Sequence, residues 1–366
     1  MDVGGGMKPK LERIRNMLAG RQLDAVRLTL QKNVSWLTGG RSHVNPLQEA
    51  ACCQIVVTRD KCVLISNNIE SRRLVEEEIG EADRACFDAV EQWPWHEPEQ
   101  LQDVLARHLE HAAVMTDVEL EAEFFALRTT FGAAEKKALE ELGRLTAEAV
   151  EQAAFDVRPG DTEFKIAGRL AYHCYERELE PVVNLIAADE RVWERRHPLP
   201  TGKAVSLYAM LVVCARRNGL IASATRLVHF GPVPEDLRAR HRAVAEIDAR
   251  IIDATRPGES LAGLYGKLRD FYREAGYPDE IDCHHQGGLT GYATRERLAT
   301  PGASFTVAPG QLYAWNPSIA GVKSEDTMLV LEDGNEILTH TGAWPMVEAE
   351  AGGRVMRRPD ILVRRI

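Results

Sequence analysis

The sequence predicts two domains: an α/β domain over residues 1–124, and an α+β domain with a curved antiparallel sheet over residues 125–366. Short apolar runs alternate with helical patterns in the first part, which is typical of an α/β domain. Long amphipathic patterns and strand pairs dominate the second part. The dipeptide Asn218-Gly219 lies between two apolar runs and is a strong signal for a tight hairpin.

Each element of the first domain follows from a local pattern. Apolar residues at helical spacing predict a helix, and the apolar runs CCQIVVT and CVLISN around RDK predict a hairpin. In chain order we expect a helix over 8–20, a strand over 23–30, a turn or short helix over 33–40, the hairpin, a helix over 69–79, and then a strand over 84–89, a helix over 97–111 and a strand over 112–117.

The second domain is predicted in the same way. Its long helices end at Pro-Gly pairs, which stop helical patterns. We expect helices over 133–157, 163–178, 234–254 and 259–275, and strands over 181–187, 204–215, 219–230, 281–285, 304–308, 311–316, 322–331 and 336–340.

Composition narrows the classes of function. The formal net charge is -10 and the chain has no run of basic residues, so we predict no nucleic-acid partner. No apolar stretch approaches the length of about 20 residues that spans a bilayer, and the start MDVGGGMKPK is no signal peptide, so we predict no membrane association. Seven scattered cysteines favour a reducing, cytoplasmic location.

Three stretches together resemble a known family. They are LERIRNMLAGRQLDAVRLTLQKNVSWLTGG, AAEKKALEELGRLTAEAVEQAAFDVRPGDTEFKIAG and GVKSEDTMLVLEDGNEILT. They are similar to the family of creatinase, prolidase and aminopeptidase P. The resemblance implies a creatinase-like N-terminal domain, a pita-bread C-terminal domain and a small-molecule substrate. It also implies a homodimer in which the N-terminal domain lies near the partner's active site.

The metallopeptidases of this family hold two metal ions with two Asp, one His and two Glu. Such a ligand set suits a pair of dications that activates a bridging water. The resemblance places these five ligands, in chain order, on Val212, Ser223, His285, Asn316 and Glu325. Because only the histidine and the last glutamate are retained, we expect no dinuclear centre, and we predict no metal and no cofactor. A lone ion on His284, His285 and Glu325 is the one metal alternative.

His197, in ERRHPLPTGKAV, is the predicted proton-transfer residue. It stands where creatinase carries the histidine with which it hydrolyses a C–N bond without metal. A histidine with a near-neutral pKa is suited to general acid/base catalysis. The alternative is a solvated loop histidine. Creatinase's two glutamates fall on Thr225 and Asn316, so creatine itself is not the expected substrate.

Glu325, with His285, is predicted to orient the proton-transfer group or the attacking water. Lys323 lies two residues before Glu325 on the same strand face, so the two side chains are expected to be able to pair. Arg295 is predicted either to bind a substrate carboxylate or to form a salt bridge with an acid. Asn316 completes this polar set.

Several neighbours are expected to border the substrate. Tyr292 stands where the peptidases carry a second histidine. Gly287 and Gly288 are expected to allow close backbone approach or positive φ. Adjacent histidines on a strand face opposite ways, so His285 alone is expected in the pocket. Cys214 and Ser223 are also placed among the substrate-binding residues. A thiol nucleophile at Cys214 or Cys283 is the weaker hypothesis, because free cysteines are mostly buried.

These observations together predict a metal-independent, creatinase-like enzyme. It would hydrolyse a C–N bond of a small amino-acid-like, amide or amidino compound, with His197 transferring the proton. Three alternatives stay open: a lyase acting on an amino-acid derivative, an inactive pseudopeptidase that only binds its ligand, and an Xaa-Pro metallopeptidase.

Overall fold

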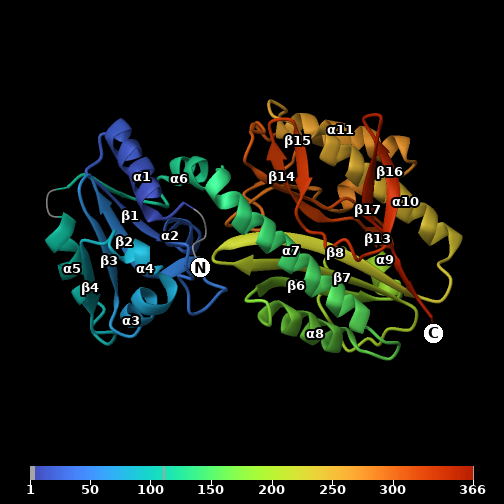
Figure 1. The fold of residues 1–366 in the computed structure, drawn as a ribbon, viewed down its shortest axis with the longest axis horizontal. Coiled ribbons are helices and arrows are strands. Elements are labelled where there is room, and N and C mark those ends of the chain that lie inside the picture. The colour runs from blue at the N-terminus through green and yellow to red at the C-terminus, as the bar shows by residue number, and fades with distance from the viewer. Residues whose placement is uncertain (1–4, 110–111, 366) are drawn as a thin grey trace. The chain divides into compact units, whose positions relative to one another are not determined.

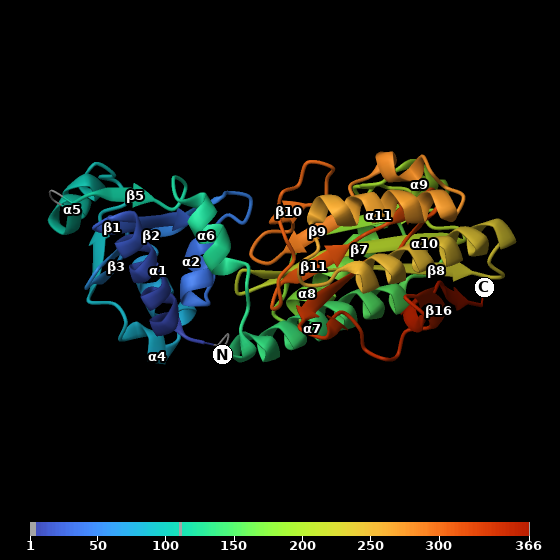
Figure 2. The ribbon, with the colours of Figure 1, turned by 90° about the horizontal axis from the view of Figure 1, so that it is seen from above.

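The computed structural model describes residues 5–109 and 112–365 and divides the chain into two compact units. The first comprises Met1–Ala138 with Asn218–Leu220, and the second Leu139–Arg217 with Ile221–Ile366 (Figure 1, Figure 2). Among the described residues, no helix is both long and apolar enough to cross a membrane.

The first unit is built on a five-stranded mixed sheet with the order β4-β3-β2-β1-β5. The pairs β1–β2 and β2–β3 are antiparallel, and β1–β5 and β3–β4 are parallel. The strands are β1 (Ala25–Leu30), β2 (Ala50–Thr58), β3 (Cys62–Asn67), β4 (Ala89–Trp93) and β5 (Val114–Thr116), and the helices are α1 (Met7–Arg21), α2 (Gln31–Thr38), α3 (Ser71–Arg73), α4 (Glu81–Arg84), α5 (Gln100–Leu109) and α6 (Glu121–Arg128). This is the predicted α/β domain.

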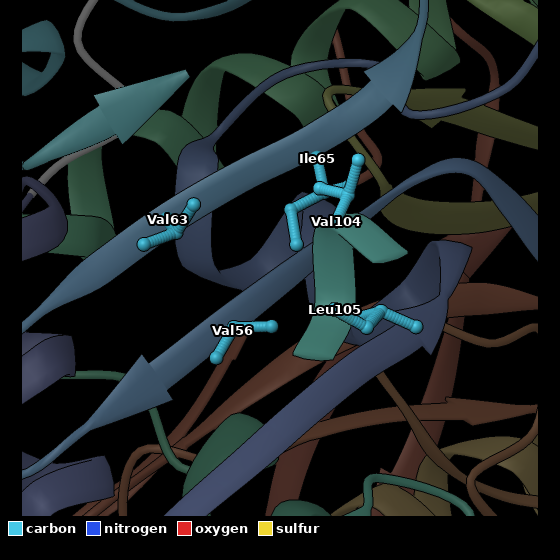
Figure 3. Packing of buried hydrophobic residues seen from close by; sticks show 5 residues of the cluster. All are labelled: Val56, Val63, Ile65, Val104 and Leu105. Carbon is cyan, nitrogen blue, oxygen red and sulfur yellow. The ribbon is translucent and has the colours of Figure 1, made fainter. Parts of the chain in front are cut away.

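Part of the core of this unit lies between the sheet and α5. Val56 of β2 and Val63 and Ile65 of β3 contact Val104 and Leu105 of α5, and all five side chains are buried (Figure 3). The two β3 residues are two positions apart and therefore point to the same face. Burying an aliphatic side chain of this size stabilises a fold by about 1.5–3 kcal/mol, so this contact holds α5 on the sheet.

Two local predictions for this unit were wrong in detail. The strand expected over 84–89 begins at Ala89, and the short helix α4 occupies Glu81–Arg84 instead. Parallel pairing with β3 sets where β4 begins, since Ala89 lies opposite Val63, and a local pattern does not contain that partner. The helix expected over 69–79 is α3 followed by a π-helical turn, Leu74–Glu78.

Among the described residues, the second unit contains two large sheets, besides two smaller sheets of two strands each, and four long helices. The helices are α7 (Ala133–Asp156), α8 (Glu163–Tyr175), α10 (Glu235–Ala254) and α11 (Leu261–Glu274), with the short α9 at Glu190–Glu194. One sheet has the order β18-β8-β7-β6 and the other β10-β9-β11-β14-β15. In Figure 1 and Figure 2, α8 lies along the first sheet, while α10 lies beside α11 and the strands of the second.

The strands of this unit have the following bounds: β6 (Glu180–Ala188), β7 (Tyr208–Arg217), β8 (Leu220–Phe230), β9 (Gly287–Thr290), β10 (Arg297–Leu298), β11 (Leu312–Trp315), β12 (Ser318–Ile319), β13 (Val322–Lys323), β14 (Asp326–Leu331), β15 (Gly334–Ile337), β16 (Met346–Ala351), β17 (Arg354–Pro359) and β18 (Leu362–Arg364). The predicted hairpin is present, with Asn218 and Gly219 at φ 51° and 86°. The segment over 304–308 forms only an isolated bridge, between Ser260 and Thr306.

Hydrogen bonds link β8 to the start of β14 and so connect the two sheets. The Thr225 N–H donates to the Glu325 carbonyl at 3.1 Å. The Ser223 N–H donates to Thr327 Oγ1 at 2.7 Å. The predicted α+β domain is confirmed, and its paired strands are antiparallel apart from the parallel contact of β18 with β8.

A buried ionic network in the same unit explains why Glu325 is followed by a second acid. Asp326 binds Arg226 at 3.1 Å and Arg358 at 2.7 Å, and Arg358 also binds Asp248 of α10 at 2.6 Å. Arg226 in turn contacts Glu151 of α7 at 3.0 Å. Asp326 therefore ties β8, β17 and two helices together, while the neighbouring Glu325 points to a different set of partners.

Candidate active site

Three imidazoles meet in the second unit. His197 lies in the segment between α9 and β7, and His284 and His285 lie between the 3-10 helix Glu280–Cys283 and β9. The Nε2 atoms of His197 and His284 are 3.0 Å apart. The rings of His284 and His285 stack with centroids 4.4 Å apart, and the His197 centroid lies 5.4 Å from that of His285. One nitrogen of each ring lies within 4.8 Å of the others.

The expectation that only one of the adjacent histidines faces the pocket was wrong. It assumed a strand over 281–285, but Glu280–Cys283 is a 3-10 helix and the strand begins at Gly287. Alternation of faces applies to strands, so it does not hold for His284 and His285. Both rings instead face His197.

An ion pair fixes the segment that carries His197. Arg196 pairs with Glu280, and its Nη1 also donates to Ser318 Oγ at 3.2 Å. Glu280 additionally accepts from the backbone N–H of Ala320 at 3.1 Å. Both side chains of the pair are largely shielded from solvent. The residue next to His197 is thereby attached to the 3-10 helix that precedes His284.

A second set of hydrogen bonds fixes the segment 284–287. The buried Tyr272 hydroxyl of α11 donates to Gln286 Oε1 at 2.8 Å and accepts from the Ser318 N–H at 2.8 Å. The Gln286 carbonyl accepts from the Asn316 N–H at 3.1 Å. Gly287 has φ 98°, and a Cβ there would lie 2.1 Å from the Ala314 carbonyl oxygen. Only glycine allows this approach of β9 to β11, as the sequence predicted.

Glu325 is the centre of a buried charge cluster. Its side chain accepts from Thr225 Oγ1 at 2.7 Å and binds Lys323 at 2.9 Å and Arg295 at 3.2 Å. Burial alone would raise the pKa of Glu325, but the two cations and the hydrogen bonds lower it to about 2. The cluster therefore contains one carboxylate and two cations, which leaves one positive charge in excess.

This environment keeps the three imidazoles neutral. Burial, followed by the charge of Lys323, lowers the pKa of His284 to about 2. Burial and the charge of Arg295 lower the pKa of His285 to about 4. His197 is exposed, yet partial loss of water and the charge of Lys323 lower its pKa too. At neutral pH each ring is uncharged and keeps one lone pair, which can accept a hydrogen bond or bind a metal ion.

Four buried polar atoms around this site have no partner among the described residues. They are the Nδ1 atoms of His284 and His285, Nε of Arg295 and Oδ1 of Asn316. Buried polar groups are normally hydrogen-bonded, and an unpaired one costs about 1–3 kcal/mol. Donors and acceptors left unpaired together are the arrangement expected of a site that receives a polar ligand.

The remaining predicted residues are also located. Asn316 follows β11 and is buried. Ser223 Oγ donates to Cys214 Sγ at 3.2 Å between β8 and β7. Burial, and then the charge of Glu325, raise the pKa of the Cys214 thiol, so it is not an activated nucleophile. Tyr292 is buried beyond β9, where its N–H donates to Glu296 Oε1 at 3.2 Å. The predicted roles of these residues in binding substrate stay predictions.

The residues present do not fit a dinuclear metal centre. Val212 is buried on β7 on the same strand face as Cys214, and it offers no ligand atom. Ser223 offers a neutral hydroxyl that is bound to a thiol. The remaining carboxylate, Glu325, is already paired with two cations. A pair of dications needs several carboxylates, and the positions implied by the resemblance supply only Glu325.

Sequence reasoning missed three residues of the site. His284 was assigned to the wrong face, Thr225 was treated only as a lost glutamate, and Arg196 was not considered. Thr225 could have been found, because it lies two residues from Ser223 on one strand and so shares its face. Arg196 and its partner Glu280 are 84 positions apart, and no local pattern connects them.

The fold is that of the creatinase and prolidase family. Residues 137–332 match the model of metallopeptidase family M24, and residues 10–149 match the creatinase/prolidase N-terminal domain. The first match alone covers more than half of the 366 residues, and the chain belongs to metallopeptidase family M24. The resemblance seen in the sequence is confirmed.

Individual relatives agree with this assignment. An uncharacterized peptidase of Staphylococcus haemolyticus is 24% identical over 360 residues, covering 90% of this chain and 99% of the relative. An Xaa-Pro dipeptidase of Pyrococcus furiosus is 25% identical over 56% of this chain and 61% of the relative. The prolidase structure from Pyrococcus horikoshii OT3 superposes with a TM-score of 0.74 at 18% identity, covering 91% of this chain and 98% of that chain.

The same fold occurs in a chain whose name is not that of a peptidase. The N-terminal domain of the FACT complex subunit SPT16 from Cicer arietinum superposes with a TM-score of 0.69 at 12% identity, covering 92% of this chain and 97% of that chain. The fold by itself therefore does not specify peptide hydrolysis.

Proposed function

We propose that the protein is a metal-independent hydrolase that cleaves the C–N bond of a small amide carrying a carboxylate. One observation carries the proposal. An exposed, neutral His197 is hydrogen-bonded to His284 beside a buried cluster with one positive charge in excess. The family's metal-bound water has no ligand set here, so the base must come from the side chains that are present.

The reaction would proceed as general acid/base hydrolysis. His197 takes a proton from water as the water oxygen attacks the amide carbonyl, and His285 together with Glu325 orients that water. The same imidazole then gives the proton to the leaving nitrogen, which yields a carboxylic acid and an amine. The hydrogen bond to His284 holds the His197 ring in one orientation. General acid/base catalysis of this kind contributes about 10²–10⁴-fold in rate.

The charge of the cluster selects the substrate. Glu325 neutralises only one of its two cations, and Arg295 still has an unpaired Nε. A substrate carboxylate beside Arg295 and Lys323 would balance the excess charge. An amidino group is a cation and would add to the excess, so between the two classes predicted from the sequence we favour the neutral amide.

We also propose a cytoplasmic homodimer in which the N-terminal domain of one subunit lies near the active site of its partner. This arrangement follows from the family resemblance. Sedimentation equilibrium tests it, and a monomer over the micromolar range would contradict it.

Two other functions have a specific observation in their favour. The name of the P. furiosus relative favours an Xaa-Pro metallopeptidase. The loss of carboxylates favours a pseudopeptidase that binds a ligand without turnover. A lyase acting on an amino-acid derivative would use the same histidines, and its products would contain an alkene in place of an acid and an amine.

The test is a screen of N-acyl and N-carbamoyl amino acids and Xaa-Pro dipeptides, with chelator or with manganese. Turnover that survives the chelator and falls about 10²–10⁴-fold in His197→Ala supports the proposal. The matched control is His340→Ala, an exposed histidine elsewhere in the same unit. Turnover of Xaa-Pro peptides only with manganese would establish the metallopeptidase. Binding of a substrate without turnover would establish the pseudopeptidase.

A further inference from the structure

The nitrogen atoms of the three imidazoles lie close together, and proton transfer by His197 does not require this spacing. His197 and His284 already have two Nε2 atoms 3.0 Å apart, and one nitrogen of His285 lies within 4.8 Å of them. This is the one group of three or more metal-binding side chains of its kind found among residues 5–109 and 112–365. Nitrogen atoms bound to one tetrahedral zinc ion lie about 3.3 Å apart, given Zn–N distances of about 2.0–2.1 Å.

Only a small movement would complete such a site. All separations are within 4.8 Å, so none would have to shorten by more than about 1.5 Å for a tetrahedral ion. His197 is the ring with most freedom to move toward the other two, because its side chain is exposed and the stacked pair of His284 and His285 is not. The open face at His197 also provides the path by which an ion would enter.

A second observation points to an external ligand. His284 is 9% exposed, and its Nδ1 is buried without a partner, as is the Nδ1 of His285. The two nearest Nε2 atoms share a proton in a hydrogen bond. If an ion took the place of that proton, the proton could move to an Nδ1 atom. Binding would then require only a change of tautomer in one ring.

We propose that His197, His284 and His285 bind a single transition-metal dication of the zinc, cobalt, nickel or copper class. Imidazole nitrogen is a ligand suited to these metals and not to magnesium or calcium. Three protein ligands leave a fourth position open for water or an anion. Of the five positions at which the resemblance places the dinuclear centre, this site uses only His285. It also differs from the lone-ion alternative on His284, His285 and Glu325, because its third ligand is His197 and not Glu325.

The charges around the site set its strength. Lys323 and Arg295 oppose a dication, and Glu325 favours it, so the net local charge weakens binding. Ligating histidines usually donate their second N–H to an acceptor, and the absence of one costs about 10–100-fold in affinity. We therefore expect reversible binding, with zinc retained in dilute buffer but removed by a chelator. Lys323→Gln should tighten binding because it removes one opposing charge.

If the proposed function is right, a bound ion would inhibit the enzyme. His197 Nε2 is engaged with His284, so the ring accepts its proton at Nδ1, and an ion on Nε2 would drive the displaced proton onto that nitrogen. Metal binding would thus lower the activity of this enzyme, whereas it raises the activity of a metallopeptidase. The binding itself does not depend on the proposed function, so the experiment below measures binding and not turnover.

The experiment is calorimetric titration of zinc into the untagged full-length protein after treatment with chelator and dialysis. We expect about one equivalent of zinc, and His284→Ala and His285→Ala should each weaken binding by at least about 10-fold. His340→Ala should bind like the unchanged protein. Circular dichroism and melting of each metal-free variant confirm that it is folded. Cobalt(II) gives an independent readout, because a four-coordinate ion absorbs visible light strongly.

Three results would overturn the proposal. One is less than about a tenth of an equivalent of zinc at concentrations well above those of the protein. Another is zinc binding that is unchanged in folded His284→Ala and His285→Ala, which would place the ion elsewhere. The third is about two equivalents that compete with manganese, which would indicate a dinuclear centre.

Discussion

Glu325 and Lys323 form one ion pair, yet their loss should have very different effects on stability. Glu325→Gln removes the carboxylate that binds both Lys323 and Arg295, and it leaves the buried Lys323 and the half-buried Arg295 without that compensation. Breaking a buried pair in this way costs about 3–5 kcal/mol. Lys323→Met leaves Glu325 balanced by Arg295 and still hydrogen-bonded to Thr225, so we expect a loss of about 1 kcal/mol.

The pKa of Glu325 shows how strongly its surroundings favour the charged carboxylate over the neutral acid. It is about 2 in the folded protein against an ordinary value of 4.5, a difference that corresponds to about 3 kcal/mol. Because the folded pKa is the lower one, this stabilisation is complete above pH 4.5 and is lost as the pH falls toward 2. About 2 kcal/mol of it is lost by pH 3. Lys323 is the leading charge that lowers this pKa. In Lys323→Met the pKa of Glu325 should therefore be higher, so the smaller stabilisation by ionised Glu325 should be lost at a higher pH.

Calorimetric melting of the full chain at pH 7 and pH 3 measures both effects. For a unit of 150–250 residues, about 3–5 kcal/mol corresponds to a fall in Tm of about 6–20 °C for Glu325→Gln. The difference in Tm between this variant and the unchanged protein should shrink at pH 3. The exposed Glu332→Gln is the control and should shift stability by no more than about 0.5 kcal/mol. A Lys323→Met loss equal to or larger than that of Glu325→Gln would refute the reasoning from excess charge.

Three other substitutions and reactions test the site. Arg196→Met should weaken zinc binding about 10–100-fold without unfolding the protein, because it frees the segment of His197; unchanged affinity would remove Arg196 from the positioning of that histidine. Tyr272→Phe leaves a buried backbone N–H unpaired and should cost about 1–3 kcal/mol in urea unfolding, and a cost near zero would mean that water replaces the hydroxyl. Iodoacetamide should label the exposed Cys283 of the native protein and spare the buried Cys214. Mass spectrometry of the labelled peptides checks this, and rapid labelling of Cys214 would contradict its burial.

Local sequence patterns predicted the long elements of this protein well. The helices α7, α8, α10 and α11 and the hairpin of β7 and β8 lie where apolar periodicity and the Asn-Gly turn place them. Their length makes the periodicity unambiguous. Short elements were predicted less well, and the segment over 281–285 is the clearest case. Five residues carry too little periodicity to separate a strand from a 3-10 helix.

The charge cluster was partly readable from the chain. Lys323 and Glu325 are two residues apart on one extended segment, so their contact follows from strand geometry. The two alternatives for Arg295 were equal in the sequence, and the structure shows the salt bridge with Glu325 while leaving its Nε unpaired. Asp326 instead belongs to a separate network with Arg226 and Arg358. The residues next to Asp326 in the sequence give no sign of this network.

The sequence by itself determined which ligand atoms the family's metal positions can supply. Residue types at positions 212, 223 and 316 are set by the chain, and neither a valine nor an amide becomes a bridging carboxylate in any fold. Only the tertiary structure decided that His284 meets His197. The two residues are 87 positions apart, and their contact depends on a 3-10 helix, the Arg196–Glu280 ion pair and the packing of Tyr272. These are long-range interactions, whose free energy depends on residues that a local pattern does not contain.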